Sequence, residues 1–117
     1  LAAEQGNAAA QYNLGVIYVF GYGVEKSDAE AVKWWSKAVE QGYTDAQYNL
    51  GGMYALGRGV DKDYIAAHIW LSLPAEQGHE DAQRVLKNLE NKMTPDQINT
   101  AKADAQRVCE RLEKNIG

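Results

Sequence analysis

The chain has 117 residues, of which 45% are hydrophobic, so it can bury one modest core, and we expect a single domain over residues 1–117. Its net charge of −4 and its lack of a basic stripe argue against nucleic-acid binding, and no apolar run approaches the ~20 residues that span a bilayer. The single cysteine, Cys109, excludes an intrachain disulfide.

The hexapeptide AQYNLG occurs at residues 10–15 and again at residues 46–51. When residues 7–42 are aligned with residues 43–78, 17 of the 36 positions are identical, where unrelated segments would give roughly two. The chain is therefore a tandem repeat, which we divide into the end of a truncated repeat (1–6), two full repeats (7–42 and 43–78), and a partial repeat with a capping helix (79–117). Because Leu1 aligns with Lys37, inside a repeat, we expect the chain to be the C-terminal piece of a longer array.

Each full repeat opens with a predicted helix, at about residues 8–20 and 44–56, in which apolar residues recur at helical spacing before a glycine stop. Both helices carry a glycine in the middle, Gly15 and Gly51, where glycine costs about 0.5–1 kcal/mol relative to alanine. We interpret these glycines as points where the partner helix comes close, with Trp34 or Trp70 as the bulky neighbour.

A loop of sequence GYGVEK or GRGVDK leads to the second helix of each repeat. Its glycines are expected to adopt positive φ, and Val24 and Val60 to pack back against the repeat. Ser27 and Asp63 are placed as N-caps of the second helices.

The second helix carries one predicted apolar stripe, which is Ala31, Trp34 and Ala38 in the first copy and Ala67 and Trp70 in the second. Because this stripe is expected to be the core, replacement of Trp70 by alanine should destabilise the fold far more than the same replacement of His68. Pro74 should bend its helix or end it early, since proline leaves the carbonyl of Trp70 without a donor.

Residues 79–117 depart from the repeat. A first-type helix at about residues 80–91 is followed by MTPDQ, in which Thr94 is a predicted N-cap, Pro95 the first helical residue and Gln97 the partner in a capping box. The last helix has apolar residues on one side only. This pattern is typical of a helix that covers the end of a solenoid and faces water with its other side.

The pattern AxAQYxLGxxYxxGxGV, followed by A, W and A and then EQG, resembles the Sel-1-like repeat, a relative of the tetratricopeptide repeat. The resemblance implies an all-α fold, an α/α solenoid of antiparallel helix pairs closed by a C-terminal capping helix, that acts as an adaptor for other proteins. The ending with WLSL and MTPDQ looks like that of bacterial members. No cysteine pair recurs in the repeats, so the disulfide-stapled branch is excluded, and both the cytoplasm and the bacterial envelope stay open as compartments.

In the tetratricopeptide geometry the first helix of each pair lines a concave groove. Carried over, that geometry makes a groove floor of Tyr12, Val16, Phe20, Tyr48 and Leu56, and a polar rim of Asn13, Asp45, Asn49 and Arg84. Ala9, Val19, Gly52, Ala55 and Asn88 fall in the same rows. The lysine and asparagine clamp by which some relatives hold a terminal carboxylate is not reproduced, because tyrosines stand where a lysine is needed. The alternative for Tyr12 and Tyr48 is packing between repeats.

The residues that could carry chemistry are few. His68, His79 and Cys109 have no metal-ligand or catalytic spacing around them, so we expect structural roles, no cofactor and no enzymatic activity. The leading hypothesis is a monomeric module that binds a protein or peptide partner, neutral or basic in view of the acidic repeats. The alternative is a bacterial cell-wall-related hydrolase or binding protein, which a serine, a histidine and a carboxylate within hydrogen-bond reach in a pocket would favour.

Overall fold

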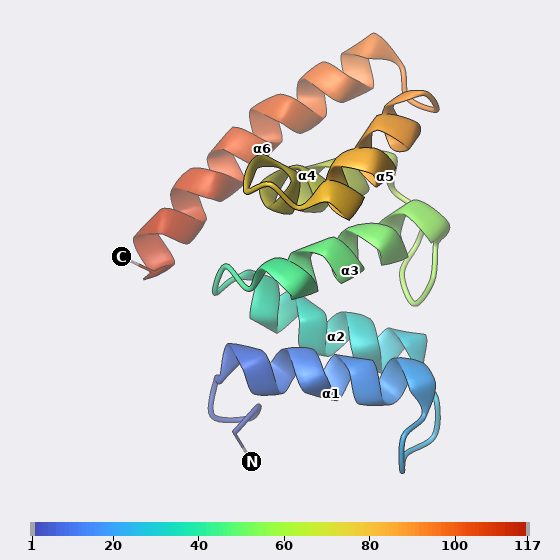
Figure 1. The fold of residues 1–117 in the computed structure, drawn as a ribbon, viewed down its shortest axis with the longest axis vertical. Coiled ribbons are helices and arrows are strands. Elements are labelled where there is room, and N and C mark those ends of the chain that lie inside the picture. Colours follow the sequence, from blue (N-terminus) through green and yellow to red (C-terminus); the bar gives the residue numbers. More distant parts are fainter. Residues whose placement is uncertain (1, 117) are drawn as a thin grey trace.

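The computed structural model describes residues 2–116, with side chains described for residues 2–115. Within that part of the chain there are six helices and no strand, which confirms the predicted all-α solenoid (Figure 1). The helices are α1 (Ala8–Phe20), α2 (Asp28–Val39), α3 (Thr44–Leu56), α4 (Tyr64–Glu76), α5 (Glu80–Glu90) and α6 (Pro95–Ile116).

The helices form antiparallel pairs that stack on one another. α1 packs on α2, α3 on α4, and α2 also contacts α3, so the second helix of the first pair lies between two first helices. α5 and α6 both pack on α4. In Figure 1, α1, α3 and α5 follow one another on the near side, while α6 runs diagonally back until the C-terminus reaches the level of α3.

Local capping explains why the helices begin where the sequence predicts. The side chains of Ser27 and Asp63 accept hydrogen bonds from backbone N–H groups three residues later, as expected of N-caps. Before α6, the Thr94 hydroxyl accepts from the Gln97 N–H and the Gln97 side chain accepts from the Thr94 N–H, which completes the predicted capping box. Pro74 neither ends α4 nor is exposed, since the helix continues to Glu76 around a buried proline.

The second helices bury the predicted Ala31, Trp34, Ala38 and Ala67, but the buried stripe is wider than predicted and also takes in the residues that follow Trp34 and Trp70. Trp35 and Leu71 are 3% and 0% exposed, whereas Trp70 is only half-buried. The prediction that Trp70 is the core residue and His68 is dispensable is therefore wrong, because His68 is buried as well. The physical reason is that α2 and α4 each pack on neighbours from more than one side, so a single stripe does not describe them.

The close approach predicted at the mid-helix glycines is confirmed, but its partners are different. A Cβ built on Gly15 would lie 2.3 Å from Trp35 Nε1, and a Cβ on Gly51 would lie 2.7 Å from Leu71 Cγ. The neighbours are therefore Trp35 and Leu71, and not Trp34 and Trp70. Trp34 is buried elsewhere, with the ammonium of Lys37 over its ring.

The two loops that follow α1 and α3 have the expected positive φ at their glycines but different surroundings. The second loop lies on the start of α2, where a Cβ on Gly59 would come within 2.5 Å of the Asp28 carbonyl oxygen. Val60 accordingly packs against the first core. Val24 is 38% exposed, so the prediction that it packs back is wrong: among the described residues, no helix stands beside its loop as α2 stands beside Val60.

The adjacent glycines of α3 give a matched test of this packing. Gly51→Ala is expected to destabilise the fold, because overpacking costs about 1–3 kcal/mol and exceeds the gain in helix propensity. Gly52→Ala is expected to stabilise it by about 0.5–1 kcal/mol, because nothing lies within 4 Å of the added methyl group. Urea denaturation of the two variants should therefore move the midpoint in opposite directions. Equal shifts would contradict the close approach of Leu71.

Candidate binding groove

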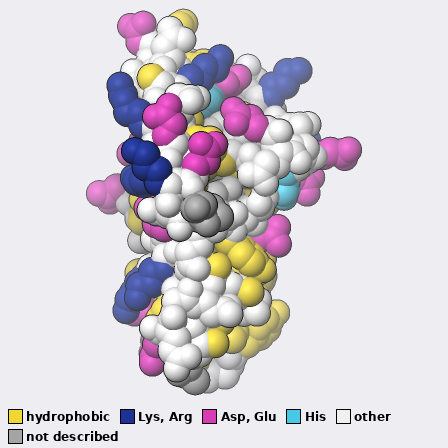
Figure 2. Space-filling model, turned by 90° about the vertical axis from the view of Figure 1, so that its left-hand side faces the viewer, with side chains coloured by type: hydrophobic (Ala, Val, Ile, Leu, Met, Phe, Trp, Pro, Cys, Tyr) yellow, Lys and Arg dark blue, Asp and Glu magenta, His cyan; other side chains and the backbone are white. Residues whose placement is uncertain are grey.

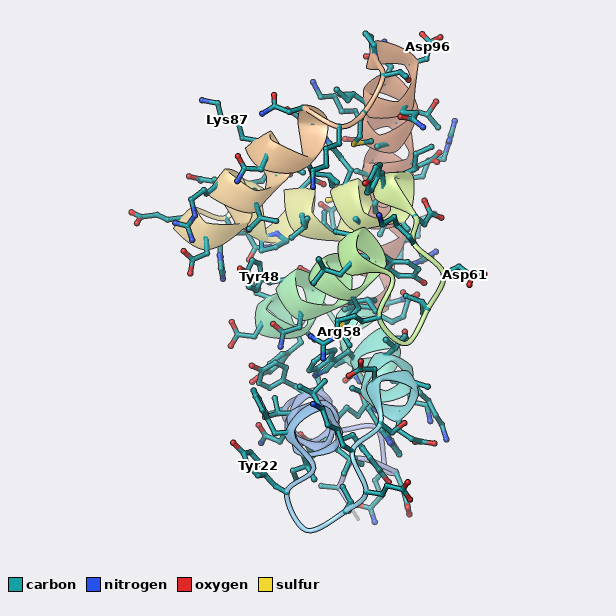
Figure 3. All side chains as sticks on the ribbon, turned by 90° about the vertical axis from the view of Figure 1, so that its right-hand side faces the viewer. Tyr22, Tyr48, Arg58, Asp61, Lys87 and Asp96 are labelled. Carbon is teal, nitrogen blue, oxygen red and sulfur yellow. The ribbon has the colours of Figure 1, made fainter. Side chains whose placement is uncertain are left out.

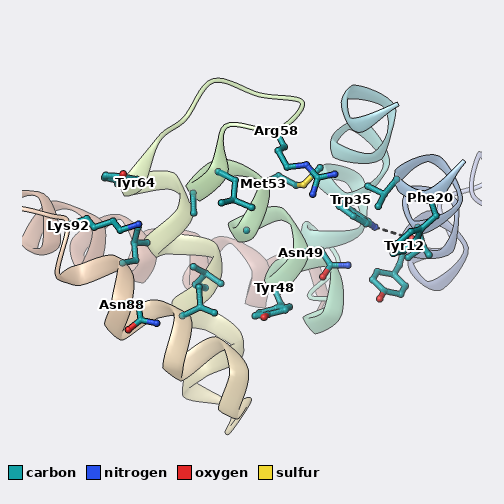
Figure 4. Close-up of a pocket in the computed structure, with 18 residues that line it drawn as sticks. Tyr12, Phe20, Trp35, Tyr48, Asn49, Met53, Arg58, Tyr64, Asn88 and Lys92 are labelled. Atoms are coloured by element: carbon teal, nitrogen blue, oxygen red, sulfur yellow. Dashed lines mark hydrogen bonds between the residues drawn. The ribbon is translucent and has the colours of Figure 1, made fainter. Parts of the chain in front are cut away.

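A groove with a volume of about 640 Å³ crosses the face formed by α1, α3 and α5 (Figure 4). The first helices of three successive pairs contribute most of its wall, and the second helices contribute its floor. The residues that line it are Tyr12, Val16, Val19, Phe20, Trp35, Tyr48, Asn49, Gly52, Met53, Ala55, Leu56, Arg58, Tyr64, Leu71, Val85, Asn88, Leu89 and Lys92.

The structure brings six of the nine predicted site residues into this groove: Tyr12, Val16, Phe20, Tyr48, Asn49 and Leu56. The other three are not among its lining residues. Asn13 and Asp45 are exposed, and Arg84 is paired with Asp81 at 2.7 Å on the surface of α5. Asn13 and Asn49 occupy the same position of the repeat, but only Asn49 lines the groove. The reason is that α3 lies in the middle of the row of helices, whereas α1 lies at its edge.

Sequence reasoning predicted Asn88 but missed eight lining residues: Trp35, Met53, Arg58, Tyr64, Leu71, Val85, Leu89 and Lys92. Trp35 reaches the groove because its indole N–H donates to the Tyr12 carbonyl at 3.0 Å, over the space that Gly15 leaves (Figure 4). Val85 and Leu89 could have been found, since they lie 36 residues after Asn49 and Met53. Arg58 could not, because it reaches the groove from a loop.

Tyr12 and Tyr48 both pack between repeats and line the groove. The Tyr12 ring lies 5.3 Å from the ring of Tyr43, which precedes α3, and the Tyr48 ring stacks on His79 at 4.6 Å. Both tyrosines are half-buried. Each ring therefore has one side fixed by the next repeat, and the two proposed roles do not exclude each other.

The mouth of the groove is more apolar than a solvent-washed surface requires. Phe20 and Leu56, at the ends of α1 and α3, are 61% and 66% exposed, and Tyr22 stacks on Phe20 at 5.4 Å. Figure 2, which faces the left-hand side of Figure 1, shows hydrophobic side chains gathered in the N-terminal half of the molecule. Figure 3, which faces the opposite side, shows Tyr22 and Tyr48 projecting in a common direction. Contiguous exposed apolar surface of this kind marks interaction sites.

The charge of the groove differs from that of the whole chain. Its lining residues include two cations, Arg58 and Lys92, and no aspartate or glutamate. Arg58 donates two hydrogen bonds to the carboxylate of Asp28 at 3.0 and 3.1 Å, and this contact raises the pKa of the guanidinium. Its charge is thus already compensated. Lys92 makes no ion pair with any residue that the structure describes.

A second hollow, of about 430 Å³, lies between α4, α5 and α6 and brings together His68, Ser72, Glu90 and Cys109. Nε2 of His68 is hydrogen-bonded to Glu90 at 2.7 Å, while the Ser72 hydroxyl donates to the Ile69 carbonyl. Because Nδ1 of His68 has no partner among the described residues, the histidine does not activate the serine. This hollow therefore lacks the arrangement that would favour a hydrolase. The described residues also contain no cluster of three potential ligands that could hold a metal ion.

Cys109 in this hollow is half-buried, as predicted, and its surroundings make it a poor nucleophile. Burial raises the pKa of the thiol, and the carboxylates of Glu113, Glu76 and Glu110 raise it further. Less thiolate is then present at a given pH, so alkylation by iodoacetamide at mildly alkaline pH should be several-fold slower than that of free cysteine. Mass spectrometry over time measures the rate. A rate equal to or above that of free cysteine would contradict the assignment.

Comparisons with known proteins agree with the geometry. The family model described as Sel1 repeat matches residues 8–43 and 44–79. A protective antigen present in uropathogenic Escherichia coli strains, with an SLR fold, is 34% identical with a TM-score of 0.90, over 98% of this chain and 25% of that one. A Sel1 repeat protein from Oxalobacter formigenes is 42% identical with a TM-score of 0.73, over 75% of this chain and 25% of that one.

The chain thus spans about a quarter of the length of these two structures. A search of curated proteins gives no match. No helix in the described part of the chain has the length and apolar character needed to cross a membrane.

Proposed function

The chain belongs to the Sel1 repeat family, whose members are generally protein-interaction modules, and from this premise we propose that it binds a peptide segment of another protein in the groove across α1, α3 and α5. The observation that carries the proposal is the exposure of Phe20 and Leu56 at the mouth of a groove with an apolar wall. Burial of one such side chain against a partner contributes about 1.5–3 kcal/mol.

The groove is formed before any partner binds. The Trp35 indole is held by its hydrogen bond to the Tyr12 carbonyl and by the absence of a side chain at Gly15, so the floor does not need to rearrange. A rigid site loses less conformational entropy on binding. Asn49 and Asn88 supply amide groups that can bond to a peptide backbone.

The expected partner is a short segment and the expected affinity is modest. A groove formed mainly by three short helices offers less area than a standard protein interface of about 1,600 Å². We further propose that the module acts as a monomer. We also propose that it performs no catalysis, because His68 and Ser72 in the second hollow are not hydrogen-bonded to each other.

The test is selection of peptides from a displayed random library, followed by affinity measurement with a fluorescent form of an enriched peptide. Leu56→Ser in the groove is expected to weaken binding about tenfold or more. Val24→Ser, which also removes an exposed apolar side chain but lies outside the groove, is the matched control and should leave the affinity unchanged. Circular dichroism verifies that both variants are folded. Equal affinities in the two variants would refute the groove as the binding site.

A further inference from the structure

Three equivalent positions of successive repeats form a row along the mouth of the groove. Phe20, Leu56 and Lys92 are each separated by 36 residues, and all three are exposed and line the groove. Phe20 and Leu56 are the last residues of α1 and α3, and Lys92 lies in the turn that follows α5. The row therefore presents an aromatic ring, an aliphatic side chain and an ammonium group in a fixed order.

The ammonium group at the end of this row is available to a partner. Lys92 has no ion pair within the described residues, and the carboxylate two positions before it, Glu90, is already bonded to His68. The other cation of the groove, Arg58, donates from Nε and Nη2 to the two carboxylate oxygens of Asp28, so its charge is already paired. Since no acidic side chain lines the groove, Lys92 is the lining cation whose charge has no anionic partner among the described residues.

On the premise of the function proposed above, we propose that the groove accepts a peptide segment whose apolar side chains lie over Phe20 and Leu56 and whose aspartate or glutamate side chain pairs with Lys92. The segment binds in one direction only, because the row is apolar at one end and cationic at the other.

The net charge of the chain does not decide this preference. A charge of −4 spread over the surface favours a neutral or basic partner at long range, but physiological salt screens that field within about 8 Å. The contact with Lys92 is made at hydrogen-bond distance, well below this screening length, so salt weakens it less than it weakens the long-range field. We therefore expect Lys92, and not the net charge of the chain, to determine which type of peptide residue binds beside it.

The test compares Lys92→Glu with Lys87→Glu, an equal change of charge at an exposed lysine of α5 that does not line the groove. Peptides selected on the unmodified chain should carry an acidic residue on one side of an apolar pair. Selection on Lys92→Glu should replace that acid by lysine or arginine, and selection on Lys87→Glu should leave it. For one enriched peptide, Lys92→Glu should weaken binding about threefold to tenfold, and exchange of the peptide's glutamate for glutamine should abolish this difference.

The possible failures are distinguishable. Two outcomes would overturn this inference and leave the proposed function standing. In the first, the selected peptides need Leu56 for binding but show no preference for an acidic residue. In the second, the Lys92→Glu variant selects the same acidic residue as the unmodified chain. A library that yields no peptide dependent on Leu56 would overturn the proposed function, and this inference with it. Lys92→Gln, which removes the charge without reversing it, should give an intermediate affinity, and an affinity equal to that of the unmodified chain would also overturn the inference.

Discussion

Replacement of Trp35 by alanine is expected to lower the free energy of unfolding by about 3–5 kcal/mol. The indole is 3% exposed and belongs to the first core, where it fills the space opposite Gly15. Alanine would leave a cavity between α1 and α2 and remove the hydrogen bond to the Tyr12 carbonyl. Because a single domain of this size is stable by only about 5–15 kcal/mol, the variant should be close to unfolding.

Two further variants separate burial from residue type. Trp70→Ala removes the same side chain from a half-buried position and should cost clearly less. Trp35→Leu places in the first pair the residue type that contacts Gly51 in the second, so it should recover part of the loss. Chemical denaturation of all three measures the differences. A larger loss for Trp70→Ala than for Trp35→Ala would contradict the burial described above.

Removal of residues 94–117 is expected to abolish cooperative unfolding and to cause aggregation. This change deletes α6, whose Ala101 and Leu112 are 0% and 6% exposed, and uncovers the side of α4 that carries Leu73 and Ala75. Helical repeat domains need a terminal helix with a polar outer face to remain soluble. Light scattering with size-exclusion chromatography and urea denaturation measure both effects.

The control for this truncation is Arg111→Ala. Arg111 of α6 pairs with Glu40 at the end of α2, but both side chains are substantially exposed, so the loss should be below about 1 kcal/mol. A truncated chain that stays monomeric and unfolds cooperatively would show that α6 is an appendage and not a cap.

Helix boundaries could be predicted from the sequence because they are determined locally. Ser27 and Thr94 cap their helices through groups only three residues away, and the glycine that follows α1 adopts positive φ whatever the repeat packs on. Both copies of the repeat carry these signals. The order of helices and the solenoid then follow, because each pair must cover its apolar faces with the next.

The neighbour against which each residue of a helix is buried could not be predicted in the same way. Trp34 and Trp35 are adjacent and chemically identical, and only the stacking of α2 between α1 and α3 places Trp35 over Gly15. Likewise, Arg58 and Lys92 belong to a loop and a turn, whose positions depend on the helices that they join. The charge of the groove therefore depends on tertiary structure, while its apolar row could be predicted from the repeat together with its resemblance to the tetratricopeptide geometry.

The contacts of the mid-helix glycines also define where the chain can be cut and rejoined. Gly15 meets Trp35 and Gly51 meets Leu71, so each glycine and its large partner lie inside one helix pair. The contacts of Arg58 and Gly59 with Asp28 instead join one pair to the pair before it. A chimaera built by exchanging whole pairs at Gly42 and Gly78 would thus keep both mid-helix glycines with their own partners, and would need matching residues only between pairs, at the loop and where α2 packs on α3. Crossovers placed within a pair would combine a glycine with the wrong side chain, so insertion, loss and shuffling of repeats are tolerated most readily in units of one complete pair.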